Sequence, residues 1–279
     1  MKKLYFLPVM AAGLLCSCSN KSTAGADGSS NNNDSTLIVY YSQTGATKSV
    51  AEEFQKLLKC DITAIEAVNP YDGDYDATIQ RWRKELEDSV KVEIKPLSVN
   101  LDDYNTVFLG FPIWGGTYAL PMATFLADNS LESKKVVTFA TFGSGGIDSA
   151  TTNISTVQPG AKVIKGYGVR NARIEKAPAE IERFLIENDY IVGEIEALPE
   201  YSSSSAVTEE EVKVFNEACG SYKFPLGTPV SVATRTTSDG KDYKFDVKSQ
   251  SPDGKESSST IYVTVPNGQA PEFTEVIRH

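Results

Sequence analysis

Five short apolar runs alternate with five amphipathic stretches between residues 36 and 190, and this alternation constrains the fold more than any other feature. The apolar runs predict strands and the amphipathic stretches predict helices. The run Thr106–Pro112 is apolar almost throughout, as in a parallel strand that is covered on both faces. Repeated strand–helix units predict a doubly wound parallel α/β sheet. The strands are expected at 36–42, 61–66, 105–112, 134–141 and 161–168, and the helices at 46–59, 75–90, 120–129, 148–156 and 177–188.

The pattern changes after Tyr190. Residues 191–205 include the low-complexity stretch LPEYSSSS and predict a linker. Thr208 is followed three residues later by Glu211, which is the spacing of a capping box, so a helix is expected to begin there.

Four alternating runs follow this helix, in the manner of strands. Ser-Asp-Gly (238–240) and Pro-Asp-Gly (252–254) are expected to be hairpin turns between them. Residues 206–279 therefore predict a second, small α+β domain of one helix and a four-strand antiparallel sheet.

The N-terminus predicts a processing segment. Lys2 and Lys3 precede an apolar run that is shorter than the roughly 20 residues needed to span a bilayer. The run ends in Leu-Cys-Ser-Cys, which resembles a bacterial lipobox. The resemblance implies that residues 1–18 contain the signal peptide and that Cys18 is lipidated as the first mature residue. A plain secretory signal with incidental cysteines is the alternative.

Residues 19–35 are small and polar, so they are expected to be a flexible tether. A lipid anchor followed by a tether would hold the protein in the bacterial cell envelope, on the periplasmic side or at the cell surface. The membrane contact is expected to come through the lipid.

Composition excludes several function classes. The formal net charge is −10 and no basic stripe is present, which argues against nucleic-acid binding. The single histidine, His279, argues against His-dependent catalysis or a His-based metal site. Cys60 and Cys219 are expected to be small buried hydrophobes, each in a helical pattern. The acidic cluster of Asp72, Asp74 and Asp76 is predicted to be a solvated turn rather than a calcium-binding loop. No metal site and no catalytic residue are predicted.

The stretch SQTGAT, residues 42–47, lies between the first predicted strand and the first predicted helix. Backbone N–H groups at a helix N-terminus lack partners and bind anions. Ser42, Thr44 and Thr47 add hydroxyl donors, and Gly45 has no Cβ to hold a ligand away. The loop predicts a phosphate site, although it matches neither a Walker loop nor a G-x-G-x-x-G fingerprint. Simple helix capping by a threonine is the alternative.

Two further loops follow the third and fourth predicted strands. In GFPIWGGTYALPM (110–122), Trp114 stands beside two glycines, which suits a ring that stacks on a flat ligand; burial in the core is the alternative. TFGSGGIDSA (141–150) is glycine-rich, so its backbone can approach a ligand closely, and Phe142 can cover a ring edge; a mobile turn is the alternative. Ligands of doubly wound sheets bind at the carboxyl ends of the strands, where the three loops are expected to meet.

S-x-T-G-x-T after the first strand, P-x-W-G after the third and the glycine-rich loop after the fourth resemble the flavodoxin family over residues 36–190. This resemblance implies the strand order 2-1-3-4-5 and FMN as the cofactor. The implied contacts are Ser42, Gln43, Thr44, Gly45, Ala46 and Thr47 at the phosphate, Pro112, Ile113, Trp114, Gly115 and Gly116 on one side of the isoalloxazine ring, and Thr141, Phe142, Gly143, Ser144 and Gly145 on the other side and at its pyrimidine end.

The resemblance further implies electron transfer at low potential, because few positive charges accompany the predicted site. Lys48, Arg170 and Arg173 are expected on the solvated surface. We expect an FMN-binding electron carrier, rather than a self-sufficient oxidoreductase, with an unknown redox partner protein or small acceptor. Two alternatives stay open: a non-redox lipoprotein binding module that has lost flavin, and an NAD(P)H-dependent FMN reductase of quinones.

Residues 206–279 resemble the cystatin-like fold. The segment TTSDG (236–240) keeps a glycine but lacks the Gln and Val of the inhibitory hairpin of cystatins. The resemblance therefore implies docking of a protein, or a spacer role, rather than inhibition of proteases.

Overall fold

The computed structural model describes residues 35–71, 74–222, 225–250 and 254–279. The predicted signal peptide, Cys18 and all but the last residue of the tether lie outside the described residues. In the part of the chain that the structure describes, no helix has the length and apolar character needed to cross a bilayer.

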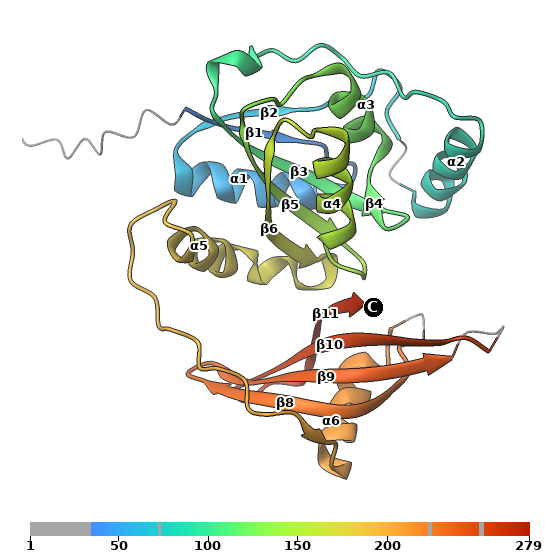
Figure 1. Cartoon of the computed structure of the whole chain (residues 1–279), viewed down its shortest axis with the longest axis vertical. Helices are drawn as coiled ribbons and strands as arrows, with labels where there is room; N and C mark the ends of the chain where they lie inside the picture. Colours follow the sequence, from blue (N-terminus) through green and yellow to red (C-terminus); the bar gives the residue numbers. More distant parts are fainter. Residues whose placement is uncertain (1–34, 72–73, 223–224, 251–253) are drawn as a thin grey trace, which may run out of the picture. The chain divides into compact units, whose positions relative to one another are not determined.

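A parallel sheet forms the first part of the described chain (Figure 1). Its strands follow the order β2-β1-β3-β5-β6, and all neighbours in this path are parallel. This is the order expected from the sequence, because β4 is an additional short strand that pairs only with β3. The strands are β1 (Thr36–Tyr40), β2 (Asp61–Ala64), β3 (Thr106–Trp114), β4 (Thr117–Tyr118), β5 (Lys135–Phe142) and β6 (Lys162–Arg170).

Helices cover both faces of this sheet (Figure 1). Successive strand residues point to opposite faces, so Val39 joins the hydrophobic cluster with α3 and α4, whereas Ile38 joins the cluster with α1 and α5. The doubly wound fold predicted from the alternating pattern is confirmed. The helices are α1 (Ala46–Leu58), α2 (Tyr75–Glu87), α3 (Leu120–Asp128), α4 (Asp148–Val157) and α5 (Ala177–Glu187), with short 3-10 turns η1 (Leu101–Asp103) and η2 (Asn171–Lys176).

A tight hairpin between β3 and β4 contains the double glycine. Gly115 has φ +56° and Gly116 has φ +88°, and a two-residue turn with two positive φ angles matches the twist of antiparallel strands. A Cβ on Gly115 would lie 2.3 Å from the indole of Trp82. Gly115 therefore permits a close contact with α2.

The C-terminal part contains an antiparallel sheet in the order β11-β10-β9-β8-β7, together with α6 (Figure 1). The helix and four of the strands were expected; the two-residue β7 pairs with Ser231 and Val232. The predicted capping box is present, since Thr208 Oγ1 accepts from the Glu211 N–H and the Glu211 carboxylate accepts from the Thr208 N–H. The elements are β7 (Ser205–Ala206), α6 (Glu209–Cys219), β8 (Thr228–Thr237), β9 (Gly240–Gln250), β10 (Glu256–Pro266) and β11 (Glu272–Arg278).

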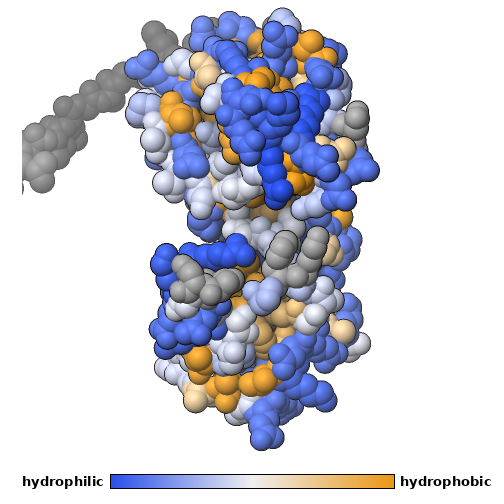
Figure 2. All heavy atoms as spheres, turned by 90° about the vertical axis from the view of Figure 1, so that its right-hand side faces the viewer, coloured by the Kyte–Doolittle hydropathy of each residue, from blue (hydrophilic) through white to orange (hydrophobic). Residues whose placement is uncertain are grey.

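The two described cysteines are free thiols. Cys219 is buried at the end of α6, as expected, and burial raises the pKa of its thiol to about 12. Cys60 is only partly buried and lies beyond the end of α1 rather than within a helix. On the face drawn in Figure 2, hydrophilic side chains predominate and apolar side chains occur in separate patches.

Candidate functional site

A cavity of about 500 Å³ lies at the carboxyl ends of β3 and β5. This volume falls within the roughly 300–1,000 Å³ typical of small-molecule sites. All ten residues predicted in the second and third loops line it. From the first loop, Gln43, Thr44 and Thr47 line this cavity, whereas Ser42 and Gly45 line a neighbouring cavity of about 330 Å³. Ala46 lines neither.

The first loop leads directly into the N-terminus of α1. Gly45 adopts φ +96°, with open space where a Cβ would stand, and its carbonyl accepts the first helical hydrogen bond from the Ser49 N–H at 2.9 Å. No side chain caps this helix, so capping by Thr44 or Thr47 is not observed. The N–H groups of the first turn lack helical acceptors and carry the positive end of the helix dipole. This end of the cavity suits an anion.

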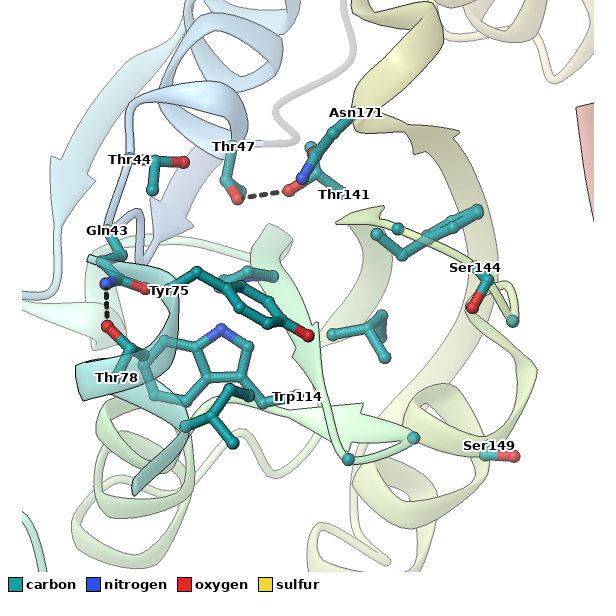
Figure 3. Close-up of a pocket in the computed structure, with 18 of the residues that line it drawn as sticks. Gln43, Thr44, Thr47, Tyr75, Thr78, Trp114, Thr141, Ser144, Ser149 and Asn171 are labelled. Atoms are coloured by element: carbon teal, nitrogen blue, oxygen red, sulfur yellow. Dashed lines mark hydrogen bonds between the residues drawn. The ribbon is translucent and has the colours of Figure 1, made fainter. Parts of the chain in front are cut away.

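Thr47 links the first loop to the third. Its hydroxyl lies 2.8 Å from that of Thr141, and both residues are almost completely buried (Figure 3). One hydroxyl donates to the other, and the hydroxyl that accepts keeps its own proton for a second acceptor. The pair therefore offers one further hydrogen bond at the cavity wall.

Helix α2 contributes a wall that the sequence analysis did not include. Tyr75, Thr78 and Ile79 line the cavity. The Gln43 side-chain amide donates to Thr78 Oγ1 at 2.5 Å, which fixes α2 against the first loop. Figure 3 shows the Tyr75 ring in the pocket beside the Trp114 indole. The helical pattern of α2 was evident in the sequence, but its orientation toward the cavity was not.

Trp114 packs mainly against buried aromatic residues of the hydrophobic core. Its indole packs edge-on against Tyr71 at 4.8 Å and Tyr41 at 6.0 Å between ring centroids, and the residue is only 8% exposed. Most of the Trp114 side chain is therefore buried in the core, as in the alternative prediction, although the residue also lines the cavity. Phe142 is likewise buried, whereas Tyr75 is 70% exposed. Tyr75 is the aromatic lining residue with the largest accessible surface.

Two arginines expected on the solvated surface are partly buried instead. Arg170 donates from Nε to the Gly143 carbonyl at 3.0 Å, and burial lowers the pKa of its guanidinium. The side chain of Arg173 is 11% exposed and pairs with Glu180 at 2.8 Å. The expectation holds only for Lys48, which is exposed.

The acidic turn before α2 has a structural role. The Asp74 carboxylate accepts from the N–H groups of Asp76 and Ala77 and so caps α2. Within the described ranges, no group of three or more His, Cys, Asp or Glu side chains is arranged to hold a metal ion. Asp72 lies outside the described residues.

The C-terminal strand also reaches the cavity. Ile277 and Arg278 of β11 line it together with the three loops. No motif in the sequence indicated this contact, since the residues are remote from the loops along the chain.

Comparisons with known proteins concern the part of the chain that forms the parallel sheet. The family model described as Flavodoxin matches residues 35–183. No curated protein matches the chain. A protein of Bacteroides eggerthii DSM 20697, provisionally named a flavoprotein, is 28% identical over 53% of this chain and 96% of its own, with a TM-score of 0.45.

Two further solved structures are similar over a comparable share of the chain. A protein of Bacteroides uniformis ATCC 8492, also provisionally named a flavoprotein, is 27% identical over 53% of this chain and 98% of its own, with a TM-score of 0.48. A flavoprotein of Lactobacillus acidophilus NCFM, solved in complex with FMN, is 22% identical over 54% of this chain and 98% of its own, with a TM-score of 0.43.

Proposed function

Because the chain belongs to the flavodoxin family, we propose that the cavity at the carboxyl edge of its parallel sheet binds FMN and that the protein carries electrons. The observation that supports this most directly is the convergence of three separate loops on one cavity, beside the N-terminus of α1. FMN requires such a combination, because it has an anionic phosphate at one end and a flat ring at the other.

The residues at the phosphate end fit that group. Thr44 is exposed and lines the cavity, so its hydroxyl is available as a donor. The first turn of α1 contains no acidic residue that would repel a phosphate. Hydrogen bonds to a charged acceptor contribute about 1.5–3 kcal/mol each, so a few neutral donors suffice to hold the phosphate.

The residues at the ring end fit a planar aromatic group. Tyr75 offers an exposed ring on one wall, and the glycine-rich third loop offers backbone on another. When bound, FMN supplies the electron-transfer chemistry. The chain binds and orients the cofactor, and its buried aromatic residues keep water away from part of the ring.

The proposal extends to location and partners. The lipobox-like sequence before Cys18 supports a lipid anchor in the bacterial envelope, where the protein would serve a redox partner protein or a small acceptor. The C-terminal sheet would offer a docking surface for a protein. Labelling with a radioactive fatty acid, in the wild type and in Cys18→Ala, tests the anchor; equal labelling of both would contradict lipidation at this residue.

The decisive experiment is a titration of the flavin-free full chain with FMN. The chain has two tryptophans, Trp82 and Trp114, and Trp82 packs where a Cβ on Gly115 would lie, so tryptophan fluorescence reports on the site itself. Saturable quenching, with flavin absorption in the bound fraction, is expected. If both signals are absent, flavin binding is rejected and the alternative of a binding module is favoured. Steady oxidation of NADPH by the FMN-loaded protein alone would favour the alternative of a reductase.

A further inference from the structure

The last residues of β11 stand at the third loop, within the cavity proposed for FMN. The contact is closest at Gly146, where a Cβ would lie 2.9 Å from Oε1 of Glu275; a Cβ on Gly145 would make an ordinary contact, 3.5 Å from Nη1 of Arg278. Both glycines also have positive φ angles, of +103° and +72°. The third loop therefore accommodates β11 as well as a ligand.

Arg170 joins β11 to the same loop. Its Nε donates to the Gly143 carbonyl at 3.0 Å, and its Nη1 donates to the Phe273 carbonyl at 2.6 Å. The guanidinium also stacks 4.0 Å from the centre of the Phe273 ring. Hydrogen bonds from a partly buried guanidinium to two backbone carbonyls fix the spacing between the loop and the strand.

A second contact holds the beginning of β11. Glu272 lies 3.5 Å from Arg173 and 3.8 Å from Lys176, both in η2. Since the Arg173 side chain is only 11% exposed, this ion pair is poorly screened by solvent. Two sets of contacts along one strand indicate that β11 is a fixed wall of the cavity.

The charges near the end of β11 are unequally compensated. Asp148 lines the cavity and forms an ion pair with Lys165 at 2.8 Å. Glu275 is near both of these residues. By contrast, no ion pair among the described residues includes Arg278, which lines the cavity and is exposed. Its positive charge is available to a ligand.

We propose that β11 is a built-in wall of the cofactor cavity and that Arg278 provides a positive charge that favours the more negatively charged, reduced form of the bound flavin. This inference rests on the proposed FMN site. It adds one positive charge to a site at which few were expected, and it makes the C-terminal region part of the redox unit. Arg278 is a positioning and potential-setting residue rather than a catalytic one.

The charge should change the affinity of the protein for reduced FMN more than for oxidised FMN. Solvent partly screens the interaction between the Arg278 charge and the flavin, so this one charge is expected to favour the reduced form by about three- to tenfold. A tenfold difference corresponds to about 30 mV in the midpoint potential of a two-electron couple. Because Arg278 is exposed, the effect should be largest at low salt.

The test measures the FMN dissociation constant and the midpoint potential of the full chain, for wild type and Arg278→Gln, at about 0.01 M and 1 M salt, where the Debye lengths are about 30 Å and 3 Å. A lower potential in R278Q at low salt, with the difference mostly lost at high salt, is expected. Arg278→Lys should restore the wild-type potential. Lys248→Gln removes one exposed charge from β9, outside the cavity lining, and should leave the potential unchanged.

The outcomes separate the two proposals. If wild type binds FMN but R278Q has the same potential, or if R278Q and K248Q change it equally, the role of Arg278 is rejected and the proposed function stands. If R278K resembles R278Q, the charge is not responsible. If wild type does not bind FMN, the proposed function is rejected and this inference with it.

Discussion

The hydroxyl oxygens of Thr47 and Thr141 lie 2.8 Å apart, although the two residues are 94 positions apart in the chain. Thr47 belongs to the first turn of α1 and Thr141 to the last residues of β5. Their hydrogen bond brings the predicted phosphate end and the predicted ring end of the site to a fixed separation.

Replacing Thr47 with Val removes this bond while keeping the shape of the side chain. We expect a loss of about 1–3 kcal/mol in the free energy of unfolding, because the Thr141 hydroxyl would lose its buried partner. Urea unfolding of the flavin-free protein measures this. Thr47→Ser keeps the hydroxyl and should lose less; equal losses in the two variants would contradict the assigned role of the hydrogen bond.

Replacing Thr44 with Ala should weaken FMN binding without reducing stability, since this residue is exposed. Loss of one hydrogen bond to a charged phosphate is expected to raise the dissociation constant by about 10- to 150-fold. Riboflavin, which has the ring but no phosphate, is the matched ligand. Its affinity should be the same for both proteins, and a parallel loss for riboflavin would place Thr44 elsewhere than at the phosphate.

The two glycines of the β3–β4 turn should differ in their tolerance of a methyl group. Gly116→Ala meets nothing within 4 Å and should cost about 1–2 kcal/mol, the strain of a left-handed backbone. Gly115→Ala has the same strain and in addition collides with Trp82, so it should cost more. Denaturant midpoints compare the two variants. Equal midpoints would mean that α2 moves freely relative to the turn.

Tyr75 should contact the flavin ring. Tyr75→Ala is expected to weaken FMN binding by about three- to tenfold, the contribution of an aromatic pair, and to increase the fluorescence of the bound flavin. Tyr75→Phe keeps the ring and should behave as wild type. Unchanged affinity and fluorescence in Y75A would assign the ring contact to other residues of the cavity.

Glu275 should make stability depend on pH. Burial raises the pKa of its carboxyl group, which Lys165 opposes and Asp148 increases. A group with a raised pKa in the folded state contributes stability below its unfolded value of about 4.5, and this stability is lost as pH rises through the folded pKa. Glu275→Gln is therefore expected to be more stable than wild type at pH 7 and equally stable near pH 4.

Glu272→Gln is the matched control on the same strand. It loses the ion pairs with Arg173 and Lys176, so it should destabilise the protein at pH 7 by roughly 1 kcal/mol. Thermal unfolding at both pH values distinguishes the two glutamates. Stabilisation by both substitutions would indicate a general effect of negative charge rather than the separate environments of the two side chains.

The sequence predicted the sheet well because each strand carries its own signal. Apolar runs such as Thr106–Pro112 are determined by burial on both faces, and the structure forms the corresponding strand. The location of the three loops could also be predicted from the sequence, because each loop follows a parallel strand and therefore lies at the carboxyl edge of the sheet. The hairpin at Gly115 and Gly116 also has a signal in the sequence, because two adjacent glycines shortly after a predicted strand favour a tight turn with positive φ angles.

The remaining walls of the cavity depend on contacts that no local pattern records. The helical period identified α2, but a period does not specify that Tyr75 faces the cavity and Trp82 faces Gly115. The burial of Trp114 depends on Tyr71, a residue with no distinctive spacing from it. The approach of Arg278 to Gly145 joins segments that are far apart along the chain. Such contacts follow from packing of the whole chain rather than from propensity.

The position of Arg170 has a consequence for how this protein is divided in the laboratory. A fragment that ends after α5 would retain every loop of the family motif but would lose the Phe273 carbonyl and ring that this guanidinium contacts. The fragment would expose the arginine to solvent and open one side of the cavity. Its flavin affinity and colour would describe a different binding site from that of the intact chain.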